Sequence, residues 1–363
     1  MIVLHLSTAK TWRGGEQQMI YLAEEMQKKQ IQQIVFCIEK SKVAEICEQK
    51  SIPYRCFKKR TSLDIFAALK LANLCKNNEI DIIHTHDSHA HTTAVLSAVL
   101  FGNKSKIFVS RRVDFPVKKT WFSYFKYNHK SVVRIACVSE MINKITSKAI
   151  KDKSKLITIY SGIDLKKFDV SFDKDFLRKE FNLEKDTVII GNTSAVAPHK
   201  DYFTFVDSAE KFIKKGISSK FFIAGNGPLQ NEIKEYIESK GLSNDIILLG
   251  FRKDILQVLN GFDVFLITSK TEGLGTSILD AFASGVPVIA TKAGGIPEIV
   301  VHEKTGLLAP IKDSNALANL LEQIINDKEL KNRLVENATE LLNSFTKENT
   351  ANKTIGEYIK LYK

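Results

Sequence analysis

The protein is a chain of 363 residues, 44% of them hydrophobic, with a formal net charge of +12. That length exceeds the usual size of a single hydrophobic core, so we expect two domains. No apolar run approaches the roughly 20 residues of a spanning helix, and five cysteines without a C-x-x-C pair favour a cytoplasmic protein with free thiols over a zinc site or a disulfide framework.

Strands and helices alternate along the first half of the chain. The predicted strands are Ile2–Leu6, Ile34–Ile38, Pro53–Phe57, Ile80–His84, Lys106–Ser110, Val132–Val138 and Leu156–Tyr160. The predicted helices are Glu16–Gln30, a segment from Ser62 or Leu63 to about Asn77, and Thr92–Leu100. This alternation is typical of a parallel sheet that is covered on both faces. The first apolar run has no basic region ahead of it, so we interpret it as a strand and not as a signal peptide.

A charged segment, residues 166–185, precedes a second series of strands. These are Val188–Asn192, Phe221–Ala224, Ile246–Leu249, Val264–Thr268 and Val286–Ala290. We therefore predict an α/β fold of two Rossmann-like, doubly wound domains that face a central cleft, with ligands at the carboxyl ends of the strands. Residues 1–180 carry 32 Lys and Arg against 18 Asp and Glu, whereas the remainder carries 21 against 23. The two halves are therefore expected to bind different partners.

The stretch Thr271–Thr291 holds the clearest ligand-binding pattern. Gly273 and Gly275 follow a buried strand. A helix is expected to begin after them, near Thr276 or Ser277, where a hydroxyl can cap the first turn. Glycines before a helix leave backbone N–H groups open to a ligand, with the positive end of the helix dipole behind them, and such a loop suits a phosphate.

Two carboxylates lie on the same stretch, Glu272 in the loop and Asp280 in the first turns of the helix. A carboxylate can accept hydrogen bonds from two neighbouring sugar hydroxyls, so this order of groups suits a nucleotide sugar. The alternative is that Asp280 forms a capping box with Ser277 and that Glu272 is a solvated acid.

Four histidines lie close together in the sequence: His84, His86, His89 and His91. The start of a helix between them would scatter the rings, and no acidic or cysteine partner has ligand spacing, so we expect no metal there. The one D-x-D, Asp173 to Asp175, is interpreted as solvated surface. The sequence has no full G-x-G-x-x-G or P-loop motif, which leaves a dehydrogenase or an ATPase without support.

The stretch Lys104–Arg134 mixes basic and aromatic residues. Its basic residues are Lys104, Lys106, Arg111, Arg112, Lys118, Lys119, Lys126, Lys130 and Arg134. Its aromatic residues are Phe108, Phe115, Trp121, Phe122, Tyr124, Phe125 and Tyr127. This composition suits an anionic bilayer surface or a lipid-phosphate acceptor, and the same mixture can bind nucleic acid. The alternative is a solvated helix with a core-facing aromatic side.

Glu272 and Asp280 are separated by seven residues, and their stretch resembles the E-x7-E element of the retaining family 4 (group 1) glycosyltransferases with the GT-B fold. Other segments carry the resemblance along most of the chain: Gly14–Glu16, Ile82–His86, Val138–Glu140, Ser161–Asp164, Gly191–Lys200, Gly225–Pro228, Gly250–Phe251 and Gly306–Leu308. Three positions depart from the family. Many members have His at Arg112, Arg at Ala195 and Glu at Asp280.

The resemblance implies roles for individual residues. The implied catalytic set is Glu272, Lys200, Arg112 and His86. The implied donor-binding set is Gly15, Arg252, Gly273, Leu274, Gly275, Thr276 and Asp280. Lys200 would neutralise the leaving diphosphate, Glu272 would contact the sugar hydroxyls, and Asp280 would hold the ribose.

The resemblance also implies domain limits and partners. Residues 1–170 would bind the acceptor, residues 171–345 the nucleotide sugar, and residues 346–363 would form a tail helix that crosses back to the first domain. The expected function is retaining transfer of a sugar from a nucleoside-diphosphate donor to a lipid-linked or cell-envelope glycan, without metal or other cofactor. The enzyme would lie in the cytoplasm, peripheral on the inner face of the plasma membrane, and bind no nucleic acid.

Three alternatives stay open. A nucleotide-sugar epimerase of the same architecture would consume donor without an acceptor. A non-catalytic protein would bind the sugar nucleotide without turnover, and the missing cation at Ala195 keeps this reading open. A nucleic-acid-binding module would use the basic first half of the chain.

Overall fold

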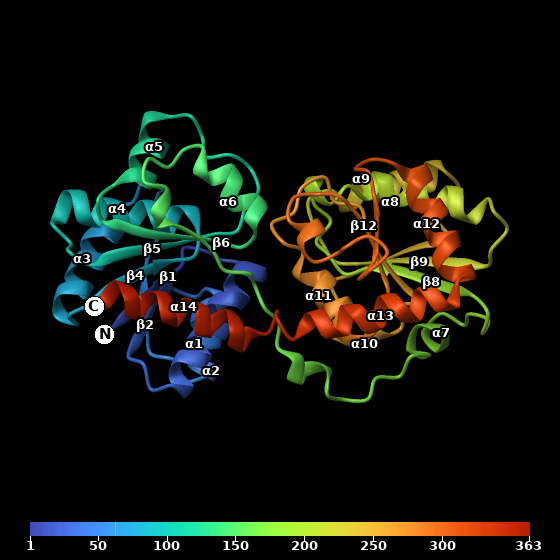
Figure 1. The fold of residues 1–363 in the computed structure, drawn as a ribbon, viewed down its shortest axis with the longest axis horizontal. Helices are drawn as coiled ribbons and strands as arrows, with labels where there is room; N and C mark the ends of the chain where they lie inside the picture. The colour runs from blue at the N-terminus through green and yellow to red at the C-terminus, as the bar shows by residue number, and fades with distance from the viewer. Residues whose placement is uncertain (62) are drawn as a thin grey trace. The chain divides into compact units, whose positions relative to one another are not determined.

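The computed structural model describes residues 1–61 and 63–363 and divides into two compact units. Unit 1 comprises Met1–Gly162 together with Lys347–Lys363, and unit 2 comprises Ile163–Thr346. Each unit contains one parallel β-sheet flanked by helices (Figure 1). The two ends of unit 2 are joined, since the backbone N–H of Ile163 donates a 2.9 Å hydrogen bond to the carbonyl of Phe345.

The sheet of unit 1 has seven strands in the order β3-β2-β1-β4-β5-β6-β7. In chain order they are β1 (Val3–Leu6), β2 (Gln33–Ile38), β3 (Tyr54–Phe57), β4 (Ile82–Thr85), β5 (Lys106–Arg111), β6 (Val132–Cys137) and β7 (Leu156–Thr158). The helices are α1 (Gly14–Lys28), α2 (Lys42–Gln49), α3 (Ile65–Asn77), α4 (Ser88–Phe101), α5 (Trp121–Asn128), α6 (Glu140–Ser147) and α14 (Lys347–Tyr362). The strand order reverses between β1 and β4, and ligands of such sheets bind where it reverses, at the carboxyl ends of the strands.

The sheet of unit 2 has six strands in the order β10-β9-β8-β11-β12-β13. They are β8 (Val188–Asn192), β9 (Ser219–Ala224), β10 (Ile246–Gly250), β11 (Val264–Ile267), β12 (Val288–Thr291) and β13 (Leu307–Ala309). The helices are α7 (Phe176–Glu180), α8 (Tyr202–Ile213), α9 (Gln230–Ser239), α10 (Ile255–Asn260), α11 (Thr276–Ala283), α12 (Ser314–Asn326) and α13 (Lys328–Leu342). Here the order reverses between β8 and β11. Helices α8 and α12 pack together over the core of this unit (Figure 1).

Side-chain caps fix where several helices of unit 1 begin. Asp64 accepts a 2.9 Å hydrogen bond from the backbone of Ala67, so α3 begins at Ile65. The predicted start at Ser62 lies outside the described residues. Asp87 caps α4 in the same way and starts it at Ser88, one turn before the predicted Thr92. In both cases an Asp oxygen satisfies N–H groups that the first turn leaves without partners.

The last helix, α14, packs beside α1 in unit 1 (Figure 1). Ala351, Ile355 and Tyr358 of α14 are buried in one cluster with residues of β1 and α1. The Tyr358 ring also packs edge-on against Phe108 of β5, with 5.2 Å between ring centroids. Helix α14 thus completes the hydrophobic core of unit 1, to which β1 and α1 also contribute.

Candidate active site

An ion pair bridges the point where the strand order of unit 2 reverses. Lys200 ends the short 3-10 turn Pro198–Lys200, which follows β8, and Glu272 lies in the loop after β11. The Lys200 Nζ donates a 2.6 Å hydrogen bond to Glu272 Oε2, and the two side chains are only 12% and 15% exposed. Two predicted site residues that are 72 positions apart in the sequence therefore meet at the carboxyl ends of β8 and β11.

Several contacts tie the loop that carries Lys200 to the loop after β11. The Thr268 hydroxyl donates to the backbone carbonyls of Lys200 and Asp201, at 3.1 and 3.0 Å. The Lys270 ammonium lies 3.0 Å from the buried carboxylate of Asp201. Lys270 also donates its backbone N–H to the carbonyl of His199 at 2.8 Å. These contacts fix the backbone on both sides of Lys200, and therefore the position from which its side chain extends.

Glu272 is positioned by two glycines that sequence reasoning missed. Gly295 donates its N–H to the Glu272 carbonyl at 3.0 Å. A Cβ on Gly294 would lie 1.9 Å from that same carbonyl oxygen, and the φ of Gly294 is +53°. Only glycine fits so close an approach in this conformation. The signal available in the sequence was the Gly-Gly pair just beyond a predicted buried strand.

Helix α11 begins at Thr276, as predicted, but the expected cap is wrong. Gly275 is the N-cap at φ +92°, and no side chain caps the helix. A capping box between Ser277 and Asp280 is therefore absent as well. The glycine conformation directs the chain into the helix and leaves first-turn N–H groups without a side-chain acceptor, an arrangement that could accept an anion. Leu274 is 3% exposed, so its buried side chain anchors the loop.

Asp280 lies on α11 and is partly buried. Burial raises the pKa of its carboxyl to about 7, and the charge of Lys167 opposes that rise. The carboxyl therefore changes charge near neutral pH, where a bound hydroxyl pair would favour its ionised form.

Arg252, which the resemblance assigns to the donor-binding set, is engaged in ion pairs within unit 2. Its guanidinium makes two hydrogen bonds to Glu180, at 2.7 and 3.1 Å, and two to Asp254, at 2.8 and 2.7 Å. Both partners raise its pKa, the Asp254 bonds most. Four of the five guanidinium N–H groups are thus used by the protein, so the side chain orders the turn after β10.

The predicted residues of the first domain meet at the carboxyl ends of β1, β4 and β5. Arg112 donates from Nη1 to the Ser161 hydroxyl at 3.1 Å, and a Cβ on Gly15 would lie 3.7 Å from Arg112 Cδ. Glu16 at the start of α1 is buried, and this raises its pKa. His86 follows β4 directly and is only 5% exposed. Arg112 and Gly15 are therefore neighbours at this edge of the sheet, whereas the His86 ring is buried.

The prediction that these rings scatter is right for His89 and His91 but wrong for His84 and His86, whose ring centroids lie 3.9 Å apart. His89 is exposed, and His91 packs on Tyr127 with 4.8 Å between ring centroids. His5 of β1, which sequence reasoning did not single out, lies with His84 and His86, and their ring nitrogens fall within 4.8 Å of one another. Such a trio could ligate a metal ion.

The trio's surroundings disfavour a divalent ion. The Arg112 cation acts on both His84 and His86. The nitrogens of His84 are already bonded to the hydroxyls of Tyr358 and Ser110. Burial, more than any charge, lowers the pKa of His84 and His86 well below the usual value, so both rings are neutral at neutral pH. Within the cluster, the His5 and His86 rings are hydrogen-bonded to each other at 3.1 Å, and His84 is bonded to hydroxyls.

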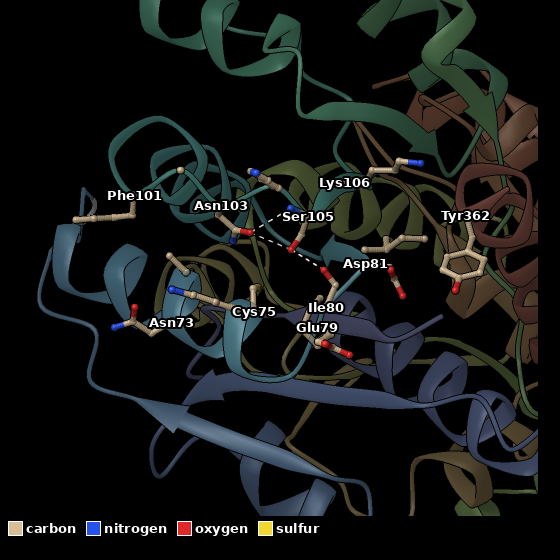
Figure 2. A pocket seen from close by; sticks show the side chains of 15 residues that line it. Asn73, Cys75, Glu79, Ile80, Asp81, Phe101, Asn103, Ser105, Lys106 and Tyr362 are labelled. Carbon is tan, nitrogen blue, oxygen red and sulfur yellow. Dashed lines mark hydrogen bonds between the residues drawn. The ribbon is translucent and has the colours of Figure 1, made fainter.

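A hollow of about 780 Å³ lies at the opposite edge of the same sheet, at the amino ends of β4 and β5 (Figure 2). Asn103 and Ser105 face it, but they bond to each other at 2.9 Å, and the Ser105 hydroxyl donates to the Ile80 carbonyl at 2.8 Å. The side chains of Asn103 and Ser105 are therefore satisfied within the protein. This edge is also the one at which doubly wound sheets do not bind their ligands.

The basic and aromatic stretch Lys104–Arg134 divides into internal and surface residues. Arg111 and Lys126 are each 5% exposed, and Arg134 pairs with Glu357 at 3.1 Å. The exposed basic residues are Lys104, Lys106, Lys118, Lys119 and Lys130. Trp121 is 77% exposed on α5. Among the helices of the described chain, none combines the length and apolar composition needed to cross a membrane.

Comparison with known proteins identifies the family. Residues 173–341 match the family model described as Glycosyl transferases group 1, and residues 12–167 match the model described as Glycosyltransferase Family 4. The chain belongs to the group 1 glycosyltransferases. This glycosyltransferase is 26% identical over 306 residues to the N-acetyl-alpha-D-glucosaminyl L-malate synthase of Bacillus anthracis, covering 82% of this chain and 78% of that protein.

Two further proteins are similar to this glycosyltransferase, one in sequence and one in fold. It is 28% identical over 280 residues to the UDP-Gal:alpha-D-GlcNAc-diphosphoundecaprenol alpha-1,3-galactosyltransferase of Escherichia coli, covering 74% of this chain and 72% of that one. Its fold is similar to that of HepE from Anabaena, solved in complex with UDP-glucose, with a TM-score of 0.86, 21% identity and 99% of each chain covered. The two parallel-sheet α/β units are those of a GT-B glycosyltransferase.

Proposed function

We propose that this glycosyltransferase transfers a sugar, with retention of anomeric configuration, from a nucleoside-diphosphate sugar held by unit 2. The observation that carries the proposal is the Lys200–Glu272 ion pair across the reversal point of the unit 2 sheet. Without donor, each side chain neutralises the other. With donor, the ammonium would face the diphosphate and the carboxylate the sugar hydroxyls, beside the uncapped start of α11.

Asp280 and the α11 loop would complete the donor site. The ionised Asp280 accepts hydrogen bonds from the two ribose hydroxyls, and the backbone from Gly273 to Thr276 binds the diphosphate. Arg252 would maintain the turn near the base through its carboxylate pairs instead of contacting the base. A uridine nucleotide is the first donor class to test, because the Escherichia coli relative is named for UDP-Gal and the HepE structure contains UDP-glucose.

The transfer itself would need no metal. Lys200 and the positive end of α11 supply the charge that stabilises the leaving diphosphate. Double displacement of the glycosidase kind needs a second carboxyl about 5 Å from the first. The carboxylate of Glu272 is instead bonded to Lys200 and to the Ser269 hydroxyl. We therefore favour transfer on one face of the sugar, with the leaving phosphate assisting deprotonation of the acceptor.

Unit 1 would bind the acceptor, with Arg112 and Gly15 at the carboxyl ends of its strands. A lipid-linked glycan of the cell envelope suits this unit, because the Escherichia coli relative is named for a diphosphoundecaprenol acceptor. The exposed Trp121 and the neighbouring lysines would place the enzyme on an anionic membrane. The cysteine thiols are unpaired, which agrees with a reducing cytoplasm.

The deciding experiment combines binding and product analysis. UDP-, GDP- and ADP-sugars are screened for thermal stabilisation of the chain, and the stabilising donor is then incubated with lipid-linked glycans. Glycoside formation that is lost in Glu272→Gln supports the proposal. Conversion of the donor to an epimer without an acceptor, or binding without any turnover, would refute it. A salt-dependent gel shift with nucleic acid that survives Glu272→Gln and Lys200→Ala would point to a nucleic-acid-binding role.

A further inference from the structure

Two thiols are in contact on neighbouring strands of unit 1, outside the set of residues assigned to the proposed function. Cys37 of β2 and Cys56 of β3 are direct partners in the parallel register of these strands. Partner residues on adjacent strands have their side chains on the same face of the sheet. The two Sγ atoms accordingly lie 3.9 Å apart, although the residues are 19 positions apart in the sequence.

The backbone around the two cysteines has the spacing that a disulfide needs. Adjacent strands lie about 4.8 Å apart, and the Cα atoms of disulfide-bonded cysteines are usually about 4.4–6.8 Å apart. Backbone hydrogen bonds hold β2 and β3 together on both sides of the pair. Val35 donates to the carbonyl of Pro53 at 2.8 Å, and Glu39 donates to that of Phe57 at 3.1 Å. Rotation of the two side chains can therefore bring the sulfurs to the bond length of about 2.05 Å while the strands stay paired.

The two thiols differ in their access to solvent. Strand β3 is the edge strand of the seven-stranded sheet, and Cys56 on it is exposed. Cys37 lies one strand further into the sheet and is 0% exposed, in one hydrophobic cluster with Val43 and Cys47 of α2. A dissolved reagent therefore reaches Cys56 first, and Cys37 is the buried thiol directly beside it.

The buried thiol is also the one that keeps its proton. Burial raises the pKa of Cys37 well above its ordinary range, and Cys56 raises it further. Burial raises the pKa of Cys56 as well, but the hydrogen bond with Cys37 opposes that rise. The nucleophile in thiol–disulfide exchange is a thiolate and not a thiol. Cys56 is therefore the thiol that reacts first, and Cys37 supplies the second sulfur.

We propose that Cys37 and Cys56 form a reversible modification site for small disulfides, in which Cys56 is the reacting thiol and Cys37 the resolving thiol. The adduct formed on Cys56 is converted into an internal disulfide that joins β2 to β3. The sulfur of Cys37 is already in contact with the sulfur that it attacks. The reaction uses no substrate of the transferase, so this proposal is independent of the proposed function.

The chemistry proceeds in two exchange steps. In the first step, the Cys56 thiolate attacks one sulfur of the small disulfide, whose S–S bond breaks, and the other half of the reagent leaves as a thiolate. In the second step, Cys37 gives its proton to solvent and its sulfur attacks Cys56 Sγ. The second half of the reagent leaves as a thiolate and takes up a proton. In total, two protein thiols are oxidised to one disulfide, and one small disulfide is reduced to two thiols.

The first test uses the native wild-type chain and an aromatic disulfide whose released thiol is coloured. We expect two thiols to be released per chain. The rate of the first release should be proportional to the reagent concentration, and the rate of the second should be independent of it, because that step is intramolecular. Peptide mapping should then find a disulfide between Cys37 and Cys56. Release of one thiol or none would overturn the proposal, and so would a disulfide that joins Cys56 to Cys47.

Matched variants separate the roles of the two thiols. Cys37→Ala should release one thiol per chain and keep the other half of the reagent on Cys56, whereas Cys56→Ser should release none on the same time scale. Cys47→Ala is the control, because Cys47 is buried in the same cluster as Cys37 but is not the register partner of Cys56. It should behave like wild type. Equal release from Cys37→Ala and wild type would overturn the resolving role. If Cys37→Ala does not fold, peptide mapping of the wild-type chain still decides which thiols pair.

Reversibility and stability complete the test. Wild type oxidised with glutathione disulfide should return to five free thiols after treatment with dithiothreitol. The oxidised chain should also unfold at a higher temperature than the reduced chain, because the cross-link restricts the unfolded state. A lower Tm after oxidation would show that the bond distorts the strands, and would overturn its formation within the native sheet.

Discussion

Lys200 and Glu272 form a 2.6 Å ion pair that is largely shielded from water, at the carboxyl ends of two neighbouring strands. Neither side chain has another charged group bonded to it within unit 2. In the proposed function, this pair would separate on donor binding, with the cation facing the diphosphate and the anion facing the sugar hydroxyls.

The first prediction concerns this pair. Glu272→Gln keeps the shape of the side chain and removes its charge, and we expect the transfer rate to fall by about 100-fold or more, a loss typical of removing one electrostatic contact to a reacting centre. Initial rates at saturating donor and acceptor measure the effect. Glu322→Gln is the matched control, because Glu322 pairs with Lys215 at 2.6 Å on the surface of the same unit. Unchanged turnover in Glu272→Gln would remove Glu272 from the mechanism.

The second prediction is a pH dependence that originates at Asp280. Burial raises its pKa from 3.8 to about 7. Between these two pKa values the unfolded chain has lost this proton, whereas the folded chain retains it. The free energy of unfolding should therefore decrease as pH rises from the lower pKa to the upper one, and level off above the upper one. The Asp280→Asn variant lacks this decrease. Denaturant unfolding at a series of pH values measures the difference, and parallel curves for the two proteins would contradict the assignment.

Nucleotide binding should have the opposite dependence. An ionised Asp280 is needed to accept two ribose hydrogen bonds, so the affinity for UDP should weaken as pH falls below the raised pKa, which is about 7. Calorimetric titration with UDP at several pH values tests this, with Asp280→Asn as the reference whose affinity is lower and less dependent on pH. An affinity for wild type that improves on acidification would contradict the ribose role.

The third prediction concerns Gly294. A methyl group there would meet the Glu272 carbonyl at 1.9 Å in a left-handed conformation. We expect Gly294→Ala to lower the free energy of unfolding by about 2–5 kcal/mol, from conformational strain and overpacking together, and to displace Glu272. Gly241→Ala is the control, since Gly241 has φ +70° but open space around its Cβ position. Urea unfolding of both variants measures the difference, and Gly241→Ala should lower the free energy of unfolding by only about 1–2 kcal/mol. Equal losses would mean that the close approach has no cost.

The fourth prediction concerns the surface around α5. Lys118 and Lys119 are exposed next to Trp121. Reversing both charges, Lys118→Glu with Lys119→Glu, should weaken binding to vesicles that contain anionic lipid by about tenfold or more, since each nearby cation contributes about 1 kcal/mol. Co-sedimentation and Trp fluorescence measure the binding. Lys328→Glu with Arg333→Glu reverses the same charge on α13 and should bind like wild type. An equal loss in both pairs would show a general charge effect.

The sequence alone determined the parts of this protein that depend on neighbouring residues. Apolar runs separated by helical segments specify two parallel sheets, because each run can only be buried between layers. Gly275 before α11 and Gly285 after it mark a helix by their left-handed backbone. The resemblance pointed to Lys200 and Glu272 from short motifs.

Only the tertiary structure decided which of those residues meet. Parallel strands bring loops distant in the sequence to one edge of a sheet, so the contact of Lys200 with Glu272, the fit of Gly294 against it and the approach of His5 to His86 have no local signature. The tertiary structure also decides which polar side chains are engaged by the protein. Arg252 is held by Asp254, two residues along the same turn, and by Glu180, which only the fold brings beside it, so the folded chain determines which of its N–H groups stay free.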